Sequence, residues 1–292
     1  MYCFLLIVYL YMPKKPPIII KANGDRVRYD RKRLMTSLLR SGASQELANS
    51  VTDKVSSEII SGTTTTYNIY ANAYNMLKSA KYHPVAARYS LKKAIMGLGP
   101  TGFPFEQFIG EILKRQGYKV KVGVNVQGHC VPHEVDVVAI KGDTHALVEA
   151  KFHNQTGVHT DVKVPLYIHS RFLDIEKKLL AKGDTHNIHE PWVVTNTHFT
   201  SSAIQYGECM GMKLFGWRYP ESGGIEKMIE DSGLHPITCL TTLSQTQKNL
   251  LLKQGTILCR ELIEKEYLFQ ELGLSGAKAG ALKREIDMIC SA

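Results

Sequence analysis

Four charged residues are spaced so that they could act together on a phosphate ester. Glu134 and Asp136 are two residues apart, and so are Glu149 and Lys151. Because the side chains of a β-strand alternate between its two faces, each pair would project from one face of its own strand. Carboxylates bind hard divalent cations, and a nearby lysine can orient or deprotonate a water and stabilise charge on a phosphate. These residue types point to metal-dependent phosphodiester chemistry.

The register of the two strands follows from the turn between them. Residues 133–140 and 145–152 read as strands, and a hairpin symmetric about the middle of the turn sets Asp136 opposite Glu149. Two ionised carboxylates about 5 Å apart repel each other unless a cation lies between them. We therefore predict that Asp136 and Glu149 bind Mg²⁺ or Mn²⁺, with Lys151 as the catalytic lysine.

The surrounding sequence predicts the elements that would hold these residues. Residues 105–113 have the apolar spacing of a helix, and Glu106 at its start would add a carboxylate near the site. An alternating strand follows at residues 118–126. After the hairpin come alternating helix and strand patterns, at residues 168–179, 192–195, 200–210 and 213–217. This order predicts an α/β fold with a mixed β-sheet flanked by helices.

Four short stretches around these residues share a pattern with a known enzyme superfamily. They are Gly-Phe-Pro-Phe-Glu at 102–106, Val-Asp-Val-Val at 135–138, Leu-Val-Glu-Ala-Lys-Phe at 147–152 and Val-Thr-Asn-Thr-His-Phe-Thr at 194–200. Residues 102–217 thereby resemble the PD-(D/E)XK nucleases, and within them the Mrr-like restriction endonucleases. The resemblance implies a restriction-endonuclease-like fold, DNA as substrate, and site roles for Asp136, Glu149, Lys151 and, as an auxiliary carboxylate, Glu106. Its relatives often have glycine or isoleucine just before the aspartate, so the place of Glu134 stays open.

Positive charge is concentrated in one third of the chain. The 292 residues carry a net charge of +9, and residues 13–100 hold 15 Lys or Arg against 5 Asp or Glu, leaving 21 against 22 elsewhere. Such a local excess favours a site for a small polyanion over a uniformly cationic surface. The 44% of hydrophobic and 22% of charged residues are typical of a globular protein and exclude wholesale disorder.

The basic segment opens on a predicted hairpin. Residues 18–21 and 26–29 flank Asn23 and Gly24, a pair typical of a two-residue type I′ turn. Residues 34–77 then show the apolar spacing of three or four helices. A hairpin beside the start of a helix can gather cations and backbone N–H groups around a triphosphate, here with Lys21, Arg26, Arg28 and Arg33.

Residues 18–95 resemble the ATP-cone, a nucleotide-binding regulatory module found on ribonucleotide reductases and on a repressor of their genes. Besides the hairpin, the resemblance includes His-Pro-Val-Ala-Ala-Arg-Tyr at 83–89. It implies that ATP or dATP is bound by Lys21, Gly24, Arg26 and Arg33. Two other interpretations stay open, a basic hairpin that contacts DNA phosphates and one that merely faces solvent.

The motifs and the helical patterns predict how the chain divides into domains. We expect an N-terminal extension at 1–16, the ATP-cone domain at 17–97, the nuclease domain at 102–219 and a helical region at 220–292.

The six cysteines lack Cys-x-x-Cys or zinc-like spacing, which predicts free thiols and a cytoplasmic protein. The apolar run 2–11 is about half the length that spans a bilayer, so we expect no membrane contact. Residues 272–278 faintly resemble a helix-hairpin-helix, although a C-cap glycine followed by a serine N-cap explains the same letters.

Together these features predict a metal-dependent DNA endonuclease regulated by ATP or dATP, with DNA and a nucleoside triphosphate as partners. The alternative is a non-enzymatic, nucleotide-responsive DNA-binding regulator that uses a nuclease-like scaffold. The opposed carboxylates favour the enzyme, because a scaffold has no physical need for them. The sequence leaves open whether the chain forms a homo-oligomer and which DNA it cuts.

Overall fold

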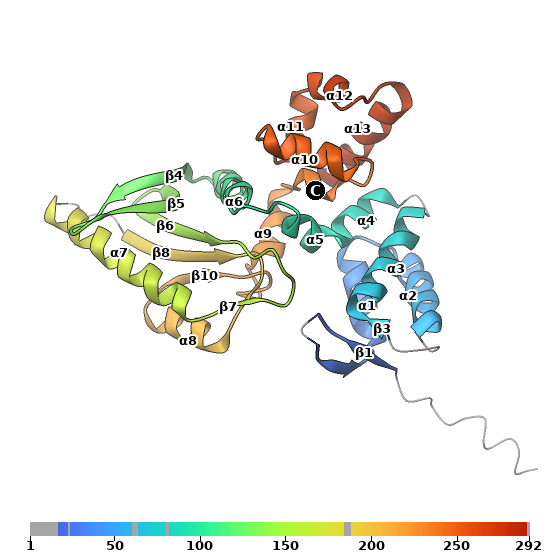
Figure 1. Cartoon of the computed structure of the whole chain (residues 1–292), viewed down its shortest axis with the longest axis horizontal. Helices are drawn as coiled ribbons and strands as arrows, with labels where there is room; N and C mark the ends of the chain where they lie inside the picture. The colour runs from blue at the N-terminus through green and yellow to red at the C-terminus, as the bar shows by residue number, and fades with distance from the viewer. Residues whose placement is uncertain (1–16, 23, 60–63, 80–81, 184–187, 291–292) are drawn as a thin grey trace, which may run out of the picture. The chain divides into compact units, whose positions relative to one another are not determined.

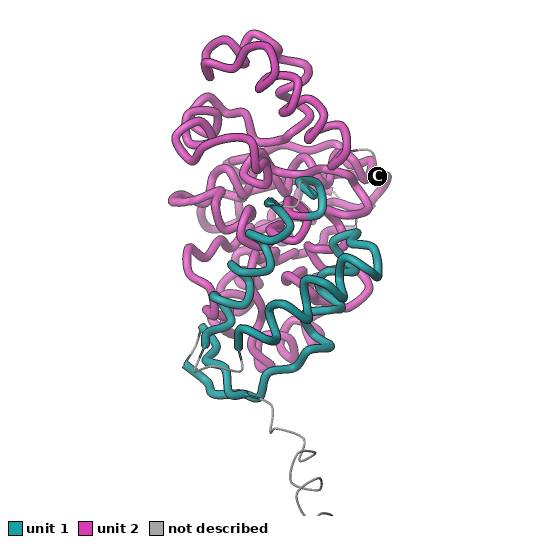
Figure 2. Tube along the Cα trace, turned by 90° about the vertical axis from the view of Figure 1, so that its right-hand side faces the viewer, with its two compact units in different colours: residues 1–85 teal, residues 86–292 magenta. Residues whose placement is uncertain are grey.

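The computed structural model describes residues 17–22, 24–59, 64–79, 82–183 and 188–290. The fold is mixed α/β, as predicted (Figure 1). Close contacts divide the chain into two compact units, residues 1–85 and residues 86–292 (Figure 2). The expected N-terminal extension and Asn23 lie outside the described residues.

The first unit contains a small sheet and the helices that follow it. Strands β1 (Ile18–Ile20) and β2 (Arg26–Arg28) pair antiparallel, and β3 (Thr64–Thr65) joins β1 in parallel. The predicted hairpin is therefore confirmed, whereas β3 was not expected. Helices α1 (Arg31–Arg40), α2 (Gln45–Ile59) and α3 (Thr66–Ser79) follow, and α4 (His83–Tyr89) spans the boundary. They bury the residues that showed helical spacing, among them Leu34, Leu38, Val51, Val55, Ile69, Ala73 and Leu77.

The turn of this hairpin is not the predicted two-residue type. The Lys21 amide donates to the Asp25 carbonyl at 2.9 Å and the Gly24 amide to the Lys21 carbonyl at 3.0 Å, so these bonds close the hairpin between Lys21 and Asp25. Gly24 has a φ of +87°, the left-handed conformation that commonly ends such a loop. The predicted turn type is thus wrong, because the strands pair Ile20 with Arg26 and leave an odd number of residues between them.

The second unit is built on a five-stranded mixed sheet of order β10-β8-β6-β5-β4. Strands β4 (Lys119–Gln127), β5 (Pro132–Lys141) and β6 (Thr144–Lys151) are antiparallel neighbours, and β8 (Ile188–Thr195) and β10 (Lys213–Phe215) continue the sheet in parallel. The β5–β6 pairs, from Val137 with Val148 to Lys141 with Thr144, have the predicted register. A separate parallel pair, β7 (His159–Thr160) with β9 (His198–Phe199), was not predicted.

Helices cover both faces of the five-stranded sheet. Helix α6 (Phe103–Arg115) packs on the face that includes Val148 and Val194, and α9 (Ile225–Ser232) joins the same core. Helices α7 (Lys163–Ala181) and α8 (Ser201–Cys209) cover the opposite face, which includes Leu147 and Val193. Neighbouring residues of one strand thus enter different cores, as the two-residue period of a strand requires. Each large apolar side chain buried in this way contributes about 1.5–3 kcal/mol.

The C-terminal helices share their core with the start of the second unit. Thr238 Oγ1 donates to the Ala94 carbonyl at 2.7 Å, and one apolar cluster includes buried residues from Ala87 to Cys290. The units therefore divide at residues 85 and 86, earlier than the expected boundary at 97–102. The elements concerned are α5 (Leu91–Met96), a 3₁₀ turn (Ile237–Cys239), α10 (Gln245–Lys253), α11 (Cys259–Glu264), α12 (Tyr267–Glu271) and α13 (Gly276–Cys290). Within the described ranges, no helix has the length and apolarity to cross a membrane.

Candidate functional site

Four carboxylates lie within electrostatic reach of one another where the β5–β6 ladder ends. The Ala150 amide donates to Asp136 Oδ2 at 2.8 Å, just beyond the last ladder pair of the two strands. Burial, and then the negative charges of Glu149 and Glu134, raise the pKa of Asp136 to about 6. Burial, and then the charges of Asp136, Glu134 and Glu149, raise the pKa of Glu106 to about 7. The structure thus brings the predicted carboxylates together, and the charge of Glu134 acts on Asp136 and Glu106.

Strand β5 changes the face that it buries at Asp136. Val135 packs in the cluster beneath α7, whereas Val137 packs in the cluster that contains the α6 side chains. Residues two apart in a regular strand share a face. Gly123 of β4 has a φ of +63° and lies at the position opposite Asp136. The ladder between β4 and β5 is interrupted there. This distortion takes Asp136 out of the regular alternation, so that its carboxylate can accept the amide of the next strand.

Helix α7 supplies a hydrogen bond to each oxygen of Glu149. Tyr167 Oη donates to Oε1 at 2.5 Å, and Arg171 Nη1 donates to Oε2 at 3.0 Å. The two donors are four residues apart and therefore lie on the same side of the helix. Burial, and then the hydrogen bond to Glu149, raise the pKa of Tyr167, which keeps the phenol protonated as a donor. Neither donor was predicted; their spacing on a predicted helix was the one available signal.

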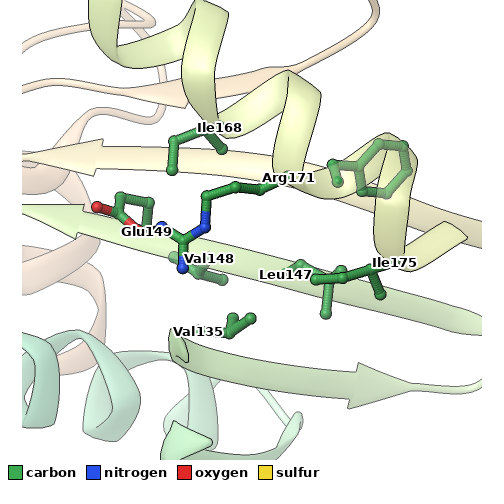
Figure 3. Close-up of a pocket in the computed structure, with 8 residues that line it drawn as sticks. Val135, Leu147, Val148, Glu149, Ile168, Arg171 and Ile175 are labelled. Carbon is green, nitrogen blue, oxygen red and sulfur yellow. Dashed lines mark hydrogen bonds and ion pairs between the residues drawn. The ribbon is translucent and has the colours of Figure 1, made fainter. Parts of the chain in front are cut away.

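A small cavity adjoins the Arg171–Glu149 pair (Figure 3). Its volume is about 20 Å³, which is room for about one water molecule. The side chains of the pair are 25% and 15% exposed, so the pair is largely withdrawn from solvent. Apolar residues form the rest of the lining, namely Val135, Leu147, Val148, Ile168, Phe172 and Ile175.

Lys151 ends strand β6 and is in register with Thr195 of β8. Strand alternation places it on the same face as Glu149, as predicted. Among the residues that the structure describes, its ammonium group forms no hydrogen bond or ion pair. Lys151 is therefore available to contact a ligand at the carboxylates.

The donor chemistry of this site suits a hard divalent cation. Each carboxylate oxygen has two lone pairs, so Asp136 and Glu149 keep ligating capacity beside the hydrogen bonds that they accept. A cation would also relieve the repulsion that contributes to the raised pKa values. Over the described ranges, no three His, Cys, Asp or Glu side chains are grouped to hold a metal ion as they stand. Asp136 and Glu149 would hold Mg²⁺ or Mn²⁺ as a two-carboxylate site, with water supplying the remaining oxygen ligands.

A basic pocket of about 460 Å³ lies in the first unit, between the hairpin and the start of α1. Lys21 and Arg33 line it as predicted, whereas Gly24 and Arg26 are not part of the lining. Arg28, which was also predicted to lie beside the triphosphate, lines it too, together with Arg31 and Lys32, which were not assigned to the nucleotide. Asp30 caps α1 by accepting the Lys32 amide at 2.9 Å.

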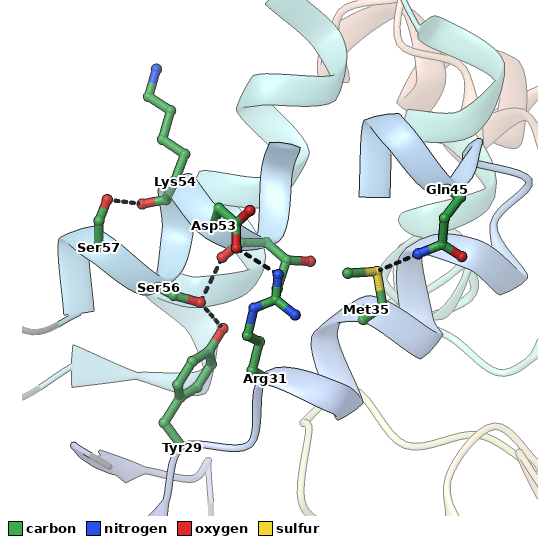
Figure 4. Close-up of polar contacts among 9 residues, drawn as sticks. Tyr29, Arg31, Met35, Gln45, Asp53, Lys54, Ser56 and Ser57 are labelled. Carbon is green, nitrogen blue, oxygen red and sulfur yellow. Dashed lines mark hydrogen bonds and ion pairs between the residues drawn. The ribbon is translucent and has the colours of Figure 1, made fainter. Parts of the chain in front are cut away.

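Acidic residues form ion pairs with some of the cationic side chains that line this pocket. Arg31 binds Asp53 of α2 at 2.5 Å (Figure 4). Lys21 lies 3.8 Å from Asp25, and Arg33 lies 3.5 Å from Asp30. In the described part of the chain, Arg28 and Lys32 form no ion pair. Tyr29, which also lines the pocket, is hydrogen-bonded to Ser56 of α2 at 2.9 Å, so the hairpin and the helices are tied together beside it (Figure 4).

Comparison with known proteins places the chain in a family. A family model described as "AF1548-like, C-terminal" matches residues 235–290. A crystal structure titled "Protein of Unknown Function AF1548" is similar with a TM-score of 0.53 and 36% identity, covering 66% of this chain and 100% of that one. The chain belongs to the AF1548-like family. An uncharacterized protein of Archaeoglobus fulgidus is 40% identical over 172 residues, which are 59% of this AF1548-like chain and 93% of that protein.

The AF1548-like C-terminal segment contains a buried carboxylate and the predicted glycine turn. Glu285 is 2% exposed and accepts the amides of Thr241 and Thr242 at 2.6 and 3.0 Å and the Thr242 hydroxyl at 2.7 Å. These bonds fix α13 to the loop before α10. Gly273 and Gly276, with φ of +66° and +51°, form the turn between α12 and α13.

Proposed function

We propose that this chain is a metal-dependent DNA endonuclease whose active site comprises Asp136, Glu149, Lys151 and Glu106. One observation carries the proposal: Asp136 and Glu149 come from adjacent strands at the point where their ladder ends, with Lys151 on the second strand. The raised pKa values of Asp136 and Glu106 add to it, because such shifts in a group of acids are common at functional sites.

The residues would divide the reaction between them. Mg²⁺ or Mn²⁺, held by Asp136 and Glu149, would supply Lewis-acid stabilisation of the phosphate when bound. The Lys151 ammonium would stabilise negative charge that develops on the scissile phosphate and orient the attacking water. Glu106, with its pKa of about 7, can gain or lose a proton near neutral pH. Tyr167 and Arg171 would hold the Glu149 carboxylate in a fixed orientation.

A cleavage assay tests this proposal. Purified protein would be incubated with plasmid DNA and Mg²⁺ or Mn²⁺, and the same assay would be run on Asp136→Ala, Glu149→Ala and Lys151→Ala. We expect cleavage by the wild type and its loss in each variant and in excess EDTA. Asp143→Ala is the matched control, because Asp143 is exposed in the turn at the other end of the same hairpin. Cleavage at the wild-type rate by Asp136→Ala/Glu149→Ala would refute the assignment.

The first unit would bind ATP or dATP and regulate the activity. A pocket of about 460 Å³ with five cationic side chains has the size and charge for a nucleoside triphosphate. Calorimetry would compare the wild type with Lys21→Ala and Arg33→Ala, and with Lys54→Ala on α2 as a control. One charge-assisted contact contributes about 1.5–3 kcal/mol, so each pocket variant should weaken nucleotide binding about tenfold or more.

The alternative, a nucleotide-responsive DNA-binding regulator, makes a different prediction. Such a protein would bind duplex DNA and respond to ATP, yet it would leave plasmid intact with either metal. We propose a cytoplasmic location for either function, supported by the free thiols of Cys130, Cys209, Cys239, Cys259 and Cys290. Light scattering with and without ATP would show whether the nucleotide also controls assembly into a homo-oligomer.

A further inference from the structure

Basic side chains from separate segments converge beside strand β9 in the second unit. Lys92 of α5 places its Nζ 3.4 Å from Nε2 of His198. His159 of β7 is in register with His198, and the centroids of their rings are 5.7 Å apart. Arg218, which follows β10, acts electrostatically on both Lys92 and His198.

Two acidic residues act on members of this cluster, Glu226 on Lys92, His198 and Arg218, and Glu230 on Arg218. Both oxygens of Glu226 are bound by Arg218, at 2.5 and 2.9 Å. Within the described residues, Lys92 forms no ion pair. Its ammonium lies 5.8 Å from the centre of the Trp217 ring, a contact that only partly replaces a counter-ion.

Burial and neighbouring cations both disfavour the protonated forms of His198 and Lys92. Burial, and then the charges of Lys92, His159 and Arg218, lower the pKa of His198 to about 4. Burial, and then Arg218, lower the pKa of Lys92. His198 is therefore neutral near pH 7, and an anion between these groups would stabilise their protonated forms.

The cluster lies close along the chain to the carboxylate site. Lys151 is in register with Thr195, and His198 follows Thr195 by three residues, a span of at most about 10 Å. The loop after Lys151 is also tied to β7, because His153 Nε2 is hydrogen-bonded to Thr160 Oγ1 at 2.9 Å. A DNA strand carries a phosphate about every 3.4 Å of helix rise, so a strand held at Lys151 can offer a second phosphate to this cluster.

We infer that Lys92, His159, His198 and Arg218 bind a phosphate group of the DNA strand whose scissile bond lies at Asp136, Glu149 and Lys151. The inference rests on the proposed function and adds to it a second anchoring point on the same strand. The shared chemistry is an anionic phosphate that presents its non-bridging oxygens to Lys92 and His198. Its source is a phosphodiester within the strand or a phosphate at its 5′ end.

Inorganic phosphate tests the site without DNA or cleavage. The ring-proton NMR signal of His198, assigned with His198→Gln, would be followed in the full chain as phosphate is added. We expect the signal to shift and the measured pKa of His198 to rise in the wild type and in Lys92→Arg, but not in Lys92→Gln. Lys213→Gln is the matched control, because Lys213 is exposed at the start of β10, paired with Trp192, whereas Arg218 follows the other end of that strand, and it should behave as wild type.

Duplex binding tests the same site with DNA. Fluorescence anisotropy would be measured with Ca²⁺ in place of Mg²⁺ over a range of salt concentrations. Loss of one phosphate contact should lower the slope of log affinity against log salt by about 1 for Lys92→Gln and leave it unchanged for Lys213→Gln. A loss seen on every duplex identifies an internal phosphodiester, and a loss seen only on a 5′-phosphorylated duplex identifies a terminal phosphate.

The outcomes separate this inference from the proposed function. If phosphate leaves the His198 signal unchanged and Lys92→Gln keeps the wild-type salt slope, the phosphate site is refuted, whether or not the protein cuts DNA. If the phosphate response and the changed slope are found in a chain that cuts no plasmid, the phosphate site stands and the endonuclease assignment fails.

Discussion

Arg171 Nη1 donates to Glu149 Oε2 at 3.0 Å, so the acidic residue expected to bind a metal is held by a cation from a helix that the motif does not include. The charge of Arg171 also lowers the pKa of Asp136, against the stronger effects of burial and Glu149. One guanidinium thus offsets part of the repulsion between two carboxylates. It does so from helix α7, which covers one face of the sheet.

Arg171→Leu should therefore damage the site without removing a ligand. Loss of the guanidinium leaves Glu149 without its fixed orientation and without its buried counter-charge. We expect cleavage to fall about 10- to 100-fold, as is usual when a group that orients a metal ligand is removed. The apparent Mg²⁺ affinity, measured by titration of the cleavage rate, should change as well.

The matched control for this variant is on the same helix. Ser170 is exposed, precedes Arg171 by one residue and donates its hydroxyl to the Leu166 carbonyl of the same helix, so Ser170→Ala should cleave as the wild type. Tyr167→Phe removes the other donor to Glu149 and should give a smaller loss than Arg171→Leu, since it removes a hydrogen bond but no charge. Equal activity of Arg171→Leu and Ser170→Ala would show that the ion pair does not position Glu149.

The raised pKa values predict how stability depends on pH in the absence of metal. Asp136 binds its proton more tightly in the folded protein, with a pKa of about 6 against 3.8. Its contribution to stability is therefore present below about pH 4 and is lost as the pH rises through about 6. Asp136→Asn should raise the unfolding free energy at pH 8 by about 1–2 kcal/mol, allowing for solvent screening, or about 2–6 °C in melting temperature.

Thermal melts of wild type and Asp136→Asn at pH 4.5 and pH 8 in EDTA would measure this effect. The gain should be larger at pH 8, and 10 mM Mg²⁺ should stabilise the wild type more than the variant. A variant that is less stable than wild type at pH 8 in EDTA would mean that the carboxylates do not repel each other in the folded chain.

The sequence predicted the parts of this site that depend on local pattern. The turn after Lys141 sets the register of β5 and β6, so the placement of Asp136 and Glu149 just beyond the last ladder pair, Val137 with Val148, follows from counting residues. Tyr167 and Arg171 could not be found in this way, because the side of a helix that meets a strand is decided by packing of the whole unit. The same holds for the change of face at Asp136, which needs the left-handed Gly123 on a neighbouring strand.

The elements that the sequence missed are short or depend on distant pairing. Strands β7 and β9 have two residues each, too few to show a two-residue alternation, yet they bring His159 and His198 together. The turn at Gly24 was assigned the wrong length because Asn-Gly suits a two-residue turn, whereas β1 and β2 pair Ile20 with Arg26 and so leave an odd number of residues between them. The sequence identified Gly24 as a turn residue, but the length of the turn depends on the register of the two strands.

Gly128→Ala should destabilise the second unit strongly. A Cβ at this position would lie 2.1 Å from Asp174 Oδ2 and 2.6 Å from the Val131 carbonyl. Asp174 cannot move aside freely, because it accepts the Cys130 amide at 2.9 Å and is bonded to His133 Nε2 at 2.8 Å. We expect a loss of about 2–4 kcal/mol, measured by urea unfolding. Gly280→Ala in the middle of α13 is the control, because replacing a helical glycine should instead raise the unfolding free energy by about 0.5–1 kcal/mol. A Gly128→Ala variant as stable as wild type would contradict this geometry.

Glu285→Ala should destabilise the C-terminal helices, because three donors would lose their acceptor. The Thr241 and Thr242 amides and the Thr242 hydroxyl all donate to this buried carboxylate. Hydrogen bonds to a charged group contribute about 1.5–3 kcal/mol each, and buried donors left without partners add a desolvation cost. We expect a loss of about 3–5 kcal/mol by urea unfolding, and a smaller loss for Glu285→Gln, whose amide oxygen can still accept. Asp143→Ala, which removes an exposed acid from the same unit, should change stability by less than about 0.5 kcal/mol. If Glu285→Ala and Asp143→Ala unfold at the same urea concentration, the three bonds do not hold α13 in place.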